Sequence, residues 1–314
     1  MAEPITPVEL EEIQPEEGAD YDVQLESLSQ WQLAWRRFKR HRMAVIGSAL
    51  FLGMVVIGIL GPLLVPYDYY KVPTPDTIVH AGRPPSLVPF RPFGETAGLQ
   101  ISVFTLVVNG VRWSLLIGVI ATAIAAFLGT LVGGIAGFYG GRLDSILMRT
   151  VDALLALPLL FVILVFTRFL GSGSWVSVTV IFGVFGWPGI SRLVRSLMLT
   201  LREEDYVDAA RAAGVSTRRI IFRHLLPNAL SPIIVVSTLS VAAVIIGEAF
   251  VSFLGYGVGN DTPTLGNILA GSLASVSLNW WWAFFPGLAI VIIVLGINFM
   301  GDGLQDALDP RAKA

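Results

Sequence analysis

Charged side chains gather in one internal segment of this 314-residue chain, between residues 192 and 228, while long stretches on both sides of it are apolar. Acids come first, among them Glu203 and Glu204, and arginines follow, among them Arg218 and Arg219. Carboxylates and guanidinium groups of this kind form ion pairs with opposite charges on a second protein. Two interpretations follow: a surface that pairs with charges on a partner, or a solvated loop that is basic only because cations stay on the cytoplasmic side of a membrane.

The same segment has the pattern of two short helices joined by a glycine. Residues 203–213 carry acids in the first turn, where the helix dipole favours them, and Gly214 follows as a C-terminal stop. Ser216 can cap a second helix, and Pro227 should end it. A glycine at the joint would also let the two helices approach closely. We therefore expect residues 202–227, here named the knob, to be compact.

Patterns typical of catalysis and of metal binding are absent from the sequence. It contains no G-x-x-x-x-G-K-[ST] phosphate loop, no H-E-x-x-H pair and no G-x-S-x-G nucleophile motif. The chain has no cysteine, and His41, His80 and His224 are far apart, so no cluster of metal ligands is expected. The sequence therefore predicts that the chain is not an enzyme and binds no metal or cofactor of its own.

Six stretches are long and apolar enough to cross a membrane. The chain is 54% hydrophobic and only 14% charged, whereas roughly 25% of the residues in soluble proteins are charged. About 20 apolar residues in a helix cross a hydrocarbon core of roughly 30 Å. The third stretch is the weakest, because Asp152 and Arg168 bracket it. The predicted spans are residues 43–65, 113–138, 151–170, 175–197, 229–249 and 283–301.

The positions of Lys and Arg predict the orientation. Cationic residues are dense in alternate segments between the spans, and such residues stay on the cytoplasmic side, so both termini and the knob should be cytoplasmic. Acids crowd the first 26 residues, where large apolar residues are few, which is typical of disorder. We expect a disordered acidic cytoplasmic leader at 1–30, the first span and an extracytoplasmic loop at 31–112, and a five-helix core at 113–311 that contains the knob.

Small residues and prolines mark special positions inside the spans. Gly129, Gly133 and Gly137 follow one another at intervals of four, which allows a second helix to pack closely. Pro158 and Pro188 should interrupt the third and fourth spans, because proline removes a helical hydrogen bond. Such breaks suit helices that move, and simple packing explains them equally well.

Glu248 is an ionisable residue near the end of the fifth predicted span. In a secondary transporter or a channel, such a residue would be a coupling site, and this class stays open as an alternative. With Pro158 and Pro188, Glu248 is a candidate for a gating or structural role.

The knob resembles the inner loop of binding-protein-dependent ABC importer permeases. In that family the loop reads Glu-Ala-Ala, three residues, Gly, nine residues, and then Ile-x-Leu-Pro. This chain departs from the pattern at Asp208, which replaces the Glu, and at His224, which replaces the Ile, but the spacing is intact. The matching residues are Asp208, Ala209, Ala210, Gly214, Leu226 and Pro227.

The resemblance covers residues 31–311 and is closest to the second, six-span (C-type) subunit of the dipeptide, oligopeptide and nickel permeases. Residues 252–257, which read Ser-Phe-Leu-Gly-Tyr-Gly, and residues 301–311 are its most specific stretches. Residues 93–100 depart from the family, which usually has Leu-Gly-Thr-Asp there followed by Gly-Arg-Asp. The family's contacts on that outer face therefore do not carry over to this chain.

The resemblance implies an all-α integral membrane fold, the six-helix type I ABC importer permease (MetI-like) bundle with cytoplasmic coupling helices, in the plasma (inner) membrane. The implied partners are a homologous second permease, two subunits that bind ATP and Mg, an extracytoplasmic substrate-binding protein and membrane lipid, with no nucleic acid. The implied cargo is dipeptides or oligopeptides moved by alternating access, with nickel as the alternative. The residues implied at the ATPase contact are Glu203, Glu204, Asp208, Ala209, Ala210, Gly214, Arg218, Arg219, Leu226 and Pro227.

Overall fold

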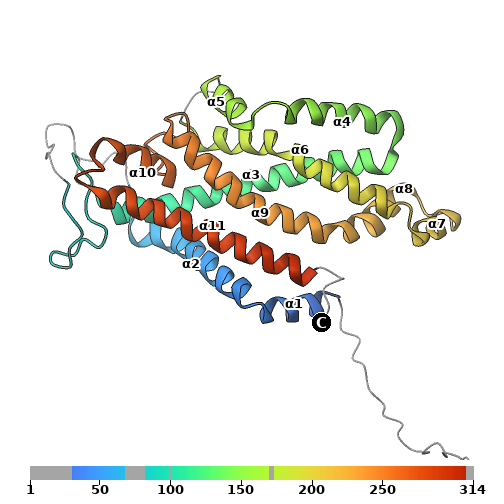
Figure 1. Ribbon diagram of the computed structural model, residues 1–314, viewed down its shortest axis with the longest axis horizontal. Coiled ribbons are helices and arrows are strands. Elements are labelled where there is room, and N and C mark those ends of the chain that lie inside the picture. Colours follow the sequence, from blue (N-terminus) through green and yellow to red (C-terminus); the bar gives the residue numbers. More distant parts are fainter. Residues whose placement is uncertain (1–29, 68–81, 99–100, 170–172, 309–314) are drawn as a thin grey trace, which may run out of the picture.

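The chain is a bundle of long helices that lie side by side (Figure 1). The computed structural model describes residues 30–67, 82–98, 101–169 and 173–308, so the predicted leader lies outside the described residues except for its last position. The knob forms one end of the bundle, the knob end, and α10 with residues 82–98 forms the opposite, far end. The α-helices are α1 (Gln30–Arg40), α2 (Arg42–Leu64), α3 (Val103–Tyr139), α4 (Gly141–Leu155), α5 (Leu159–Phe169), α6 (Trp175–Leu201), α7 (Asp205–Ala212), α8 (Thr217–Ile220), α9 (Leu226–Phe253), α10 (Leu265–Ser272) and α11 (Trp280–Leu308).

Five helical rods among the described residues are long and apolar enough to cross a membrane, namely α2, α3, α6, α11 and the run Thr217–Phe253 that ends with α9. The helices α4 and α5 form a sixth candidate that is bent by 82° at the break between them. Pro158 lies in this break, which confirms the predicted interruption of the third span. The predicted extent of that span, 151–170, is wrong, because the bent pair begins at Gly141.

The second span begins earlier than predicted, at Val103 and not at residue 113. Residues that were expected in the outer loop belong to α3 because polar groups hold its first turns. The Ser102 hydroxyl accepts the Thr105 N–H (3.4 Å), and Asn109 Nδ2 donates to the Val65 carbonyl at the end of α2 (2.9 Å). Phe104 packs edge-on against Phe93 of the preceding loop.

Helices α3 and α6 pack closely along the predicted glycine positions. A Cβ atom at Gly133 would lie 2.3 Å from the Ser191 carbonyl oxygen, and one at Gly129 would lie 2.8 Å from Ile190. Real Cβ atoms do not approach so closely, so only glycine permits this separation. The predicted close helix contact is thereby confirmed, and its partner is α6.

The predicted interruption of the fourth span at Pro188 is wrong. Helix α6 runs from Trp175 to Leu201 with Pro188 buried inside it. Packing outweighs the lost hydrogen bond, because α3 holds α6 on both sides of the proline, at Ile190 and at Gly183. Helix α6 is therefore a continuous rod.

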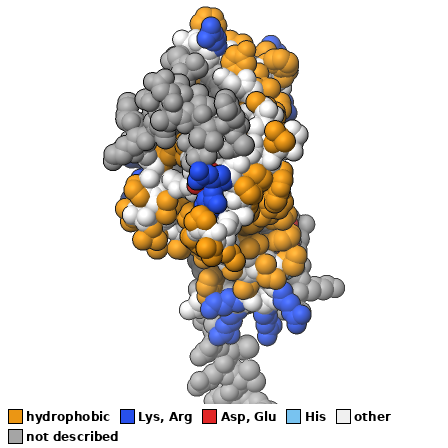
Figure 2. Space-filling model, turned by 90° about the vertical axis from the view of Figure 1, so that its left-hand side faces the viewer, with side chains coloured by type: hydrophobic (Ala, Val, Ile, Leu, Met, Phe, Trp, Pro, Cys, Tyr) orange, Lys and Arg blue, Asp and Glu red, His pale blue; other side chains and the backbone are white. Residues whose placement is uncertain are grey.

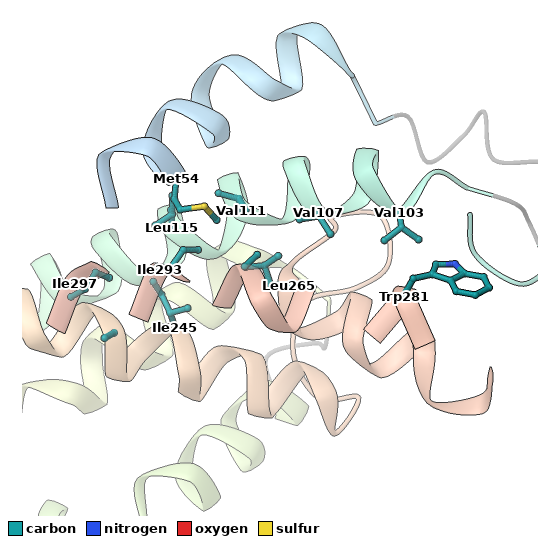
Figure 3. Packing of buried hydrophobic residues seen from close by; sticks show 12 residues of the cluster. Met54, Val103, Val107, Val111, Leu115, Ile245, Leu265, Trp281, Ile293 and Ile297 are labelled. Carbon is teal, nitrogen blue, oxygen red and sulfur yellow. The ribbon is translucent and has the colours of Figure 1, made fainter. Parts of the chain in front are cut away.

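The far end has its own hydrophobic core, formed where five helices meet. Side chains of α2, α3, α9, α10 and α11 point toward one another there (Figure 3), with Leu265 at the start of α10 among them. Away from such cores the surface stays apolar, and Figure 2 shows large hydrophobic areas on one face. Exposed apolar side chains over this much of a helical bundle are typical of contact with lipid tails.

Candidate docking site

The first helix of the knob ends in a hydrogen-bonded glycine turn, as predicted. Helix α7 has Asp205 and Asp208 in its first turn. At its end the Gly214 N–H donates to the Arg211 carbonyl and the Val215 N–H donates to the Ala210 carbonyl, both at 3.0 Å. This pair of bonds satisfies the last carbonyls of the helix and requires a positive φ, which is +75° at Gly214.

The reason for glycine at position 214 differs from the prediction. A Cβ atom there would meet nothing within 4 Å, so the residue does not bring two helices together. The left-handed backbone is what demands glycine, because other residues are strained at this φ. Gly214 therefore sets the direction of the chain between α7 and α8.

The second helix of the knob does not end at Pro227, which corrects the prediction. Helix α8 passes into a π-helical turn, η3 (Ile221–Leu225), and then directly into α9, so that Thr217–Phe253 is one rod. The wider turn is visible in the bond from the Leu226 N–H to the Ile221 carbonyl. Pro227 falls in the first turn of α9, where a missing N–H is tolerated, and Asn228 Nδ2 donates to the His224 carbonyl (2.8 Å).

The knob is fixed to the bundle by buried apolar side chains. Val207 of α7, Ile220 of α8 and Leu225 of η3 are fully or almost fully buried. They belong to one core cluster with Val194 and Met198 of α6. Burying such side chains stabilises the packed state by about 1.5–3 kcal/mol each. The knob thus moves with α6 and α9.

Arginines of α6 connect the knob end to the neighbouring helices. Arg195 Nη2 donates to Asp144 Oδ2 of α4 (2.6 Å), and Arg192 pairs with Asp152 of the same helix. Arg202, which follows α6, donates to the Gly137 carbonyl near the end of α3 (3.1 Å). Polar contacts thus connect the C-terminal end of α3 and the acids of α4 to α6, which leads into the knob.

The predicted contact residues divide into an outer and an inner set. Asp208 is exposed and pairs with Arg211 (2.9 Å), while Glu203 is exposed and pairs with Arg202 (2.8 Å). Ala210 and Leu226 are half-buried against the core cluster and support the knob from inside. The remaining predicted residues are exposed, namely Glu204, Ala209, Gly214, Arg218, Arg219 and Pro227.

A groove on the knob contains an aromatic residue that the sequence analysis missed. It has a volume of about 590 Å³ and is lined by Ser216, Arg218, Arg219, Phe222, Arg223 and Pro227. Phe222 is 61% exposed, whereas its helical neighbours Ile220 and Leu225 are buried. The sequence did contain a signal for Phe222, because it is an apolar residue on the polar side of the second predicted helix of the knob. Aromatic residues beside arginines are typical of the centres of protein interfaces.

The three predicted gating residues lie on different elements. Pro158 is exposed at the break between α4 and α5, Pro188 is inside α6, and Glu248 is fully buried in α9. The Glu248 carboxylate accepts hydrogen bonds from the hydroxyls of Ser252 (2.7 Å) and Ser114 (3.3 Å). It therefore links α9 to α3 near the far end, away from the knob.

Each hydroxyl around Glu248 is oriented by a backbone N–H. Ser114 Oγ accepts from Leu265 N (3.1 Å), and Ser252 Oγ accepts from Val258 N (3.2 Å). Thr264, which precedes Leu265, accepts from the Asn267 N–H as the N-cap of α10. A hydroxyl whose lone pair is occupied in this way directs its proton to the carboxylate. The hydrogen bonds around the buried carboxyl group thus hold α10 against α3 and α9.

Comparison with known proteins identifies the family. Residues 129–314 match the model of the binding-protein-dependent transport system inner membrane component, and residues 29–85 match the N-terminal transmembrane domain of oligopeptide transport permease C. The dipeptide transport system permease protein DppC of Bacillus subtilis (strain 168) is 38% identical over 93% of this chain and 89% of its own length. The oligopeptide permease protein OppC of the same organism is 35% identical over 93% of both chains.

A solved structure shares the fold. In an inward-facing structure of the MetNI methionine ABC transporter, one chain matches with a TM-score of 0.54 and 23% identity, over 65% of this chain and 96% of that one. This likeness confirms the predicted bundle of a type I importer permease, and the match to the family model confirms the resemblance carried by the knob. The chain belongs to the family of binding-protein-dependent transport system inner membrane components, the multi-pass permease subunits of ABC importers.

Proposed function

We propose that this chain moves dipeptides or oligopeptides across the plasma membrane by alternating access, driven by ATP and Mg bound on separate subunits. Support for the cargo comes from relatives named as dipeptide and oligopeptide permeases, whereas the alternative, nickel, has no such support. The complex would also contain a homologous second permease, two ATP-binding subunits and an extracytoplasmic binding protein. The family argues against the secondary transporter or channel that the sequence analysis left open.

The observation that carries the mechanism is the continuity of the knob with α9. A subunit that binds the exposed knob can push or rotate the rod Thr217–Phe253 without loss at a hinge. Moving a pore from 1:99 to 99:1 between two states requires about 5.5 kcal/mol of preference for one of them. The buried anchors Val207, Ile220 and Leu225 let the knob transmit such a load.

Phe222 is expected to be the apolar anchor of the ATPase contact. Replacing it by alanine should weaken co-purification of the ATPase subunits at least tenfold, because hot-spot aromatics contribute about 2 kcal/mol or more. The stability of the permease should not change, since Phe222 is exposed. Phe127, which is 69% exposed in the middle of α3, is the matched control, and its alanine variant should keep the complex. Equal co-purification of the Phe222→Ala variant and the wild type would contradict this role.

The proposed orientation places the knob and both termini in the cytoplasm. Because the chain lacks cysteine, a single introduced cysteine can report on which side of the membrane its position lies, and the parent chain without cysteine is the control. Val88→Cys, at a site that is 90% exposed at the far end, should react with a membrane-impermeant maleimide in intact cells. Ala213→Cys on the knob should react only after permeabilisation, and a reporter fused after Lys313 should be cytoplasmic. Labelling of position 213 in intact cells would reverse the orientation.

The atypical stretch that begins at residue 93 supports the far end from inside. Gly94 and Thr96 are buried, and Trp281 Nε1 of α11 donates to the Glu95 carbonyl (3.1 Å). The tip of the preceding turn carries some of the most exposed side chains at this end, with Leu87 and Val88 among them. We therefore place the contact with the binding protein at that tip and not at residues 93–98.

Uptake measurements in cells test the cargo. In cells that carry this chain with its partner subunits, uptake of a labelled dipeptide should depend on the chain and should be inhibited by unlabelled peptides. Excess nickel should leave peptide uptake unchanged. Nickel uptake that depends on the chain, without peptide uptake, would favour the alternative cargo.

A further inference from the structure

The helix α1 presents one exposed face that combines cations with an indole ring. At 100° per residue, Trp35, Arg36, Lys39 and Arg40 fall within one side of the helix. All four side chains are exposed, whereas Ala34 and others on the opposite side are half-buried and α1 packs there on α11. The face is thus turned away from the bundle.

The aromatic and cationic groups of this face are arranged together. The Lys39 ammonium lies 4.9 Å from the centre of the Trp35 ring, a cation–π contact. Trp35 itself is 58% exposed. An indole ring with its edge free is favourable at the headgroup level of a bilayer, where one part of the ring is wet and the other is apolar.

In the part of the chain that the structure describes, the charges of this face have no acidic partners. Between residues 27 and 67 the sequence contains no Asp or Glu. Among the described residues, Arg36, Lys39 and Arg40 form no ion pair, although Arg37 on the inner side has a partner. Asp306 of α11 is instead paired with His41 (3.4 Å). Within residues 30–67, 82–98, 101–169 and 173–308, nothing neutralises these three neighbouring cations, so they can bind an anion.

The face continues directly into a surface that is suited to lipid. His41 links α1 to α2, and its Nδ1 accepts the Ala44 N–H as the N-cap of α2 (3.1 Å). Helix α2 then exposes large apolar residues along its length, such as Leu52, Ile59 and Leu63. In Figure 2 one group of Lys and Arg side chains lies below the hydrophobic surface, at the lower side where Figure 1 places α1, while others lie at the centre and the top of the view.

We propose that the exposed face of α1 binds anionic phospholipid headgroups. The phosphates pair with Arg36, Lys39 and Arg40, while the Trp35 ring lies at headgroup depth beside the apolar face of α2. Basic clusters next to a span are attracted to anionic lipid, and the attraction acts within a Debye length of the surface. Guanidinium groups also bind phosphate oxygens in pairs. In a zwitterionic headgroup a cation of the lipid itself offsets the phosphate charge, whereas in an anionic headgroup that charge is left for the arginines. This inference is independent of the ATPase contact.

Native mass spectrometry of the full-length chain, released from nanodiscs with equal amounts of phosphatidylglycerol and phosphatidylcholine, tests the proposal. The wild type should retain phosphatidylglycerol several-fold over phosphatidylcholine. The variant Arg36→Gln/Lys39→Gln/Arg40→Gln should retain the two lipids nearly equally. The matched control Arg218→Gln/Arg219→Gln/Arg223→Gln loses the same charge on the knob and should behave as the wild type.

Two results would overturn the proposal. One is an undiminished preference for phosphatidylglycerol in the α1 variant, and the other is an equal loss of preference in the knob control, which would indicate a general charge effect. Should the triple α1 variant fail to insert, the single variants Arg36→Gln and Lys39→Gln give the same test, each with a partial loss. The Trp35→Ala variant should lower retention of both lipids, and unchanged retention would remove the indole from the site.

Discussion

Replacing Gly214 by valine is expected to uncouple transport from ATP hydrolysis while the chain still inserts into the membrane. At φ +75° a β-branched residue is strained by about 1–3 kcal/mol. Relief of that strain would turn α7 relative to α8 and so misalign the two halves of the docking surface. Where the whole of this strain energy opposes docking, the affinity of the knob for the ATPase subunits falls roughly 10- to 100-fold. The measurement is peptide uptake compared with ATPase activity in the reconstituted complex.

Two further variants show whether the effect belongs to the knob. Gly98 has φ +79° and equally open surroundings, but it lies at the far end, so Gly98→Val carries a similar backbone strain without touching the knob. That variant should keep coupling. Gly214→Asn should also keep most of it, since asparagine tolerates this backbone better than valine does. Normal uptake by Gly214→Val would end the proposed role of the glycine turn.

Replacing Glu248 by glutamine is expected to destabilise the far end and to abolish transport. The carboxylate accepts hydrogen bonds from the Ser114 and Ser252 hydroxyls in a fully buried site. The side-chain amide of glutamine would place an N–H donor opposite a hydroxyl that also donates. One of the two groups would then lack a hydrogen-bond partner, and each buried group left unsatisfied costs about 1–3 kcal/mol. Thermal unfolding of the detergent-solubilised chain can be monitored by size-exclusion chromatography. The midpoint temperature of the Glu248→Gln variant should be lower than that of the wild type.

Ser240→Ala is the matched control for this experiment. Ser240 lies on the same helix, but its hydroxyl donates only to the Val236 carbonyl one turn earlier (2.7 Å). Its loss should change the midpoint little, because the partner carbonyl keeps its place in the helix. An unfolding midpoint of Glu248→Gln equal to that of the wild type would show that the hydrogen bonds to the carboxylate do not stabilise the far end.

The position and turn geometry of the knob could be predicted from local sequence because its signals are local. Acids in a first turn and a glycine after the last turn act within a few residues, and the structure has the expected glycine turn at Gly214. The long apolar runs likewise placed the spans, since length and hydropathy decide whether a helix can cross a bilayer. The bend at Pro158 is local too, because proline ends a helix where little packing opposes it.

Predictions failed where packing between distant segments outweighed local preference. Pro188 stays inside α6 because α3 packs on both sides of it, and Pro227 stays in a continuous rod because a π-turn receives it while Leu225 is buried beside it. Pro188 and Pro227 have the same local tendency to interrupt a helix as Pro158. Only the neighbouring helices distinguish them, and the sequence does not show which helices are neighbours.

The environment of Glu248 was also beyond local analysis. Its partners come from α3 and from α9 itself, and the α3 partner Ser114 is in turn bonded to α10, so the site exists only once these segments meet. Phe222 differs, because its position among Arg219 and Arg223 was visible in the sequence. A test for apolar residues on the polar side of the second knob helix would have found it.

Peptide uptake by reconstituted vesicles, with and without the ATPase subunits, tests the ATP-driven mechanism most directly. Vesicles that contain this chain, its second permease, the binding protein and both ATPase subunits should accumulate labelled peptide when ATP and Mg are supplied on the knob side. Omission of the ATPase subunits should reduce uptake to the level of empty vesicles. Undiminished uptake by vesicles that lack the ATPase subunits would contradict the mechanism and identify the chain as a secondary transporter or a channel.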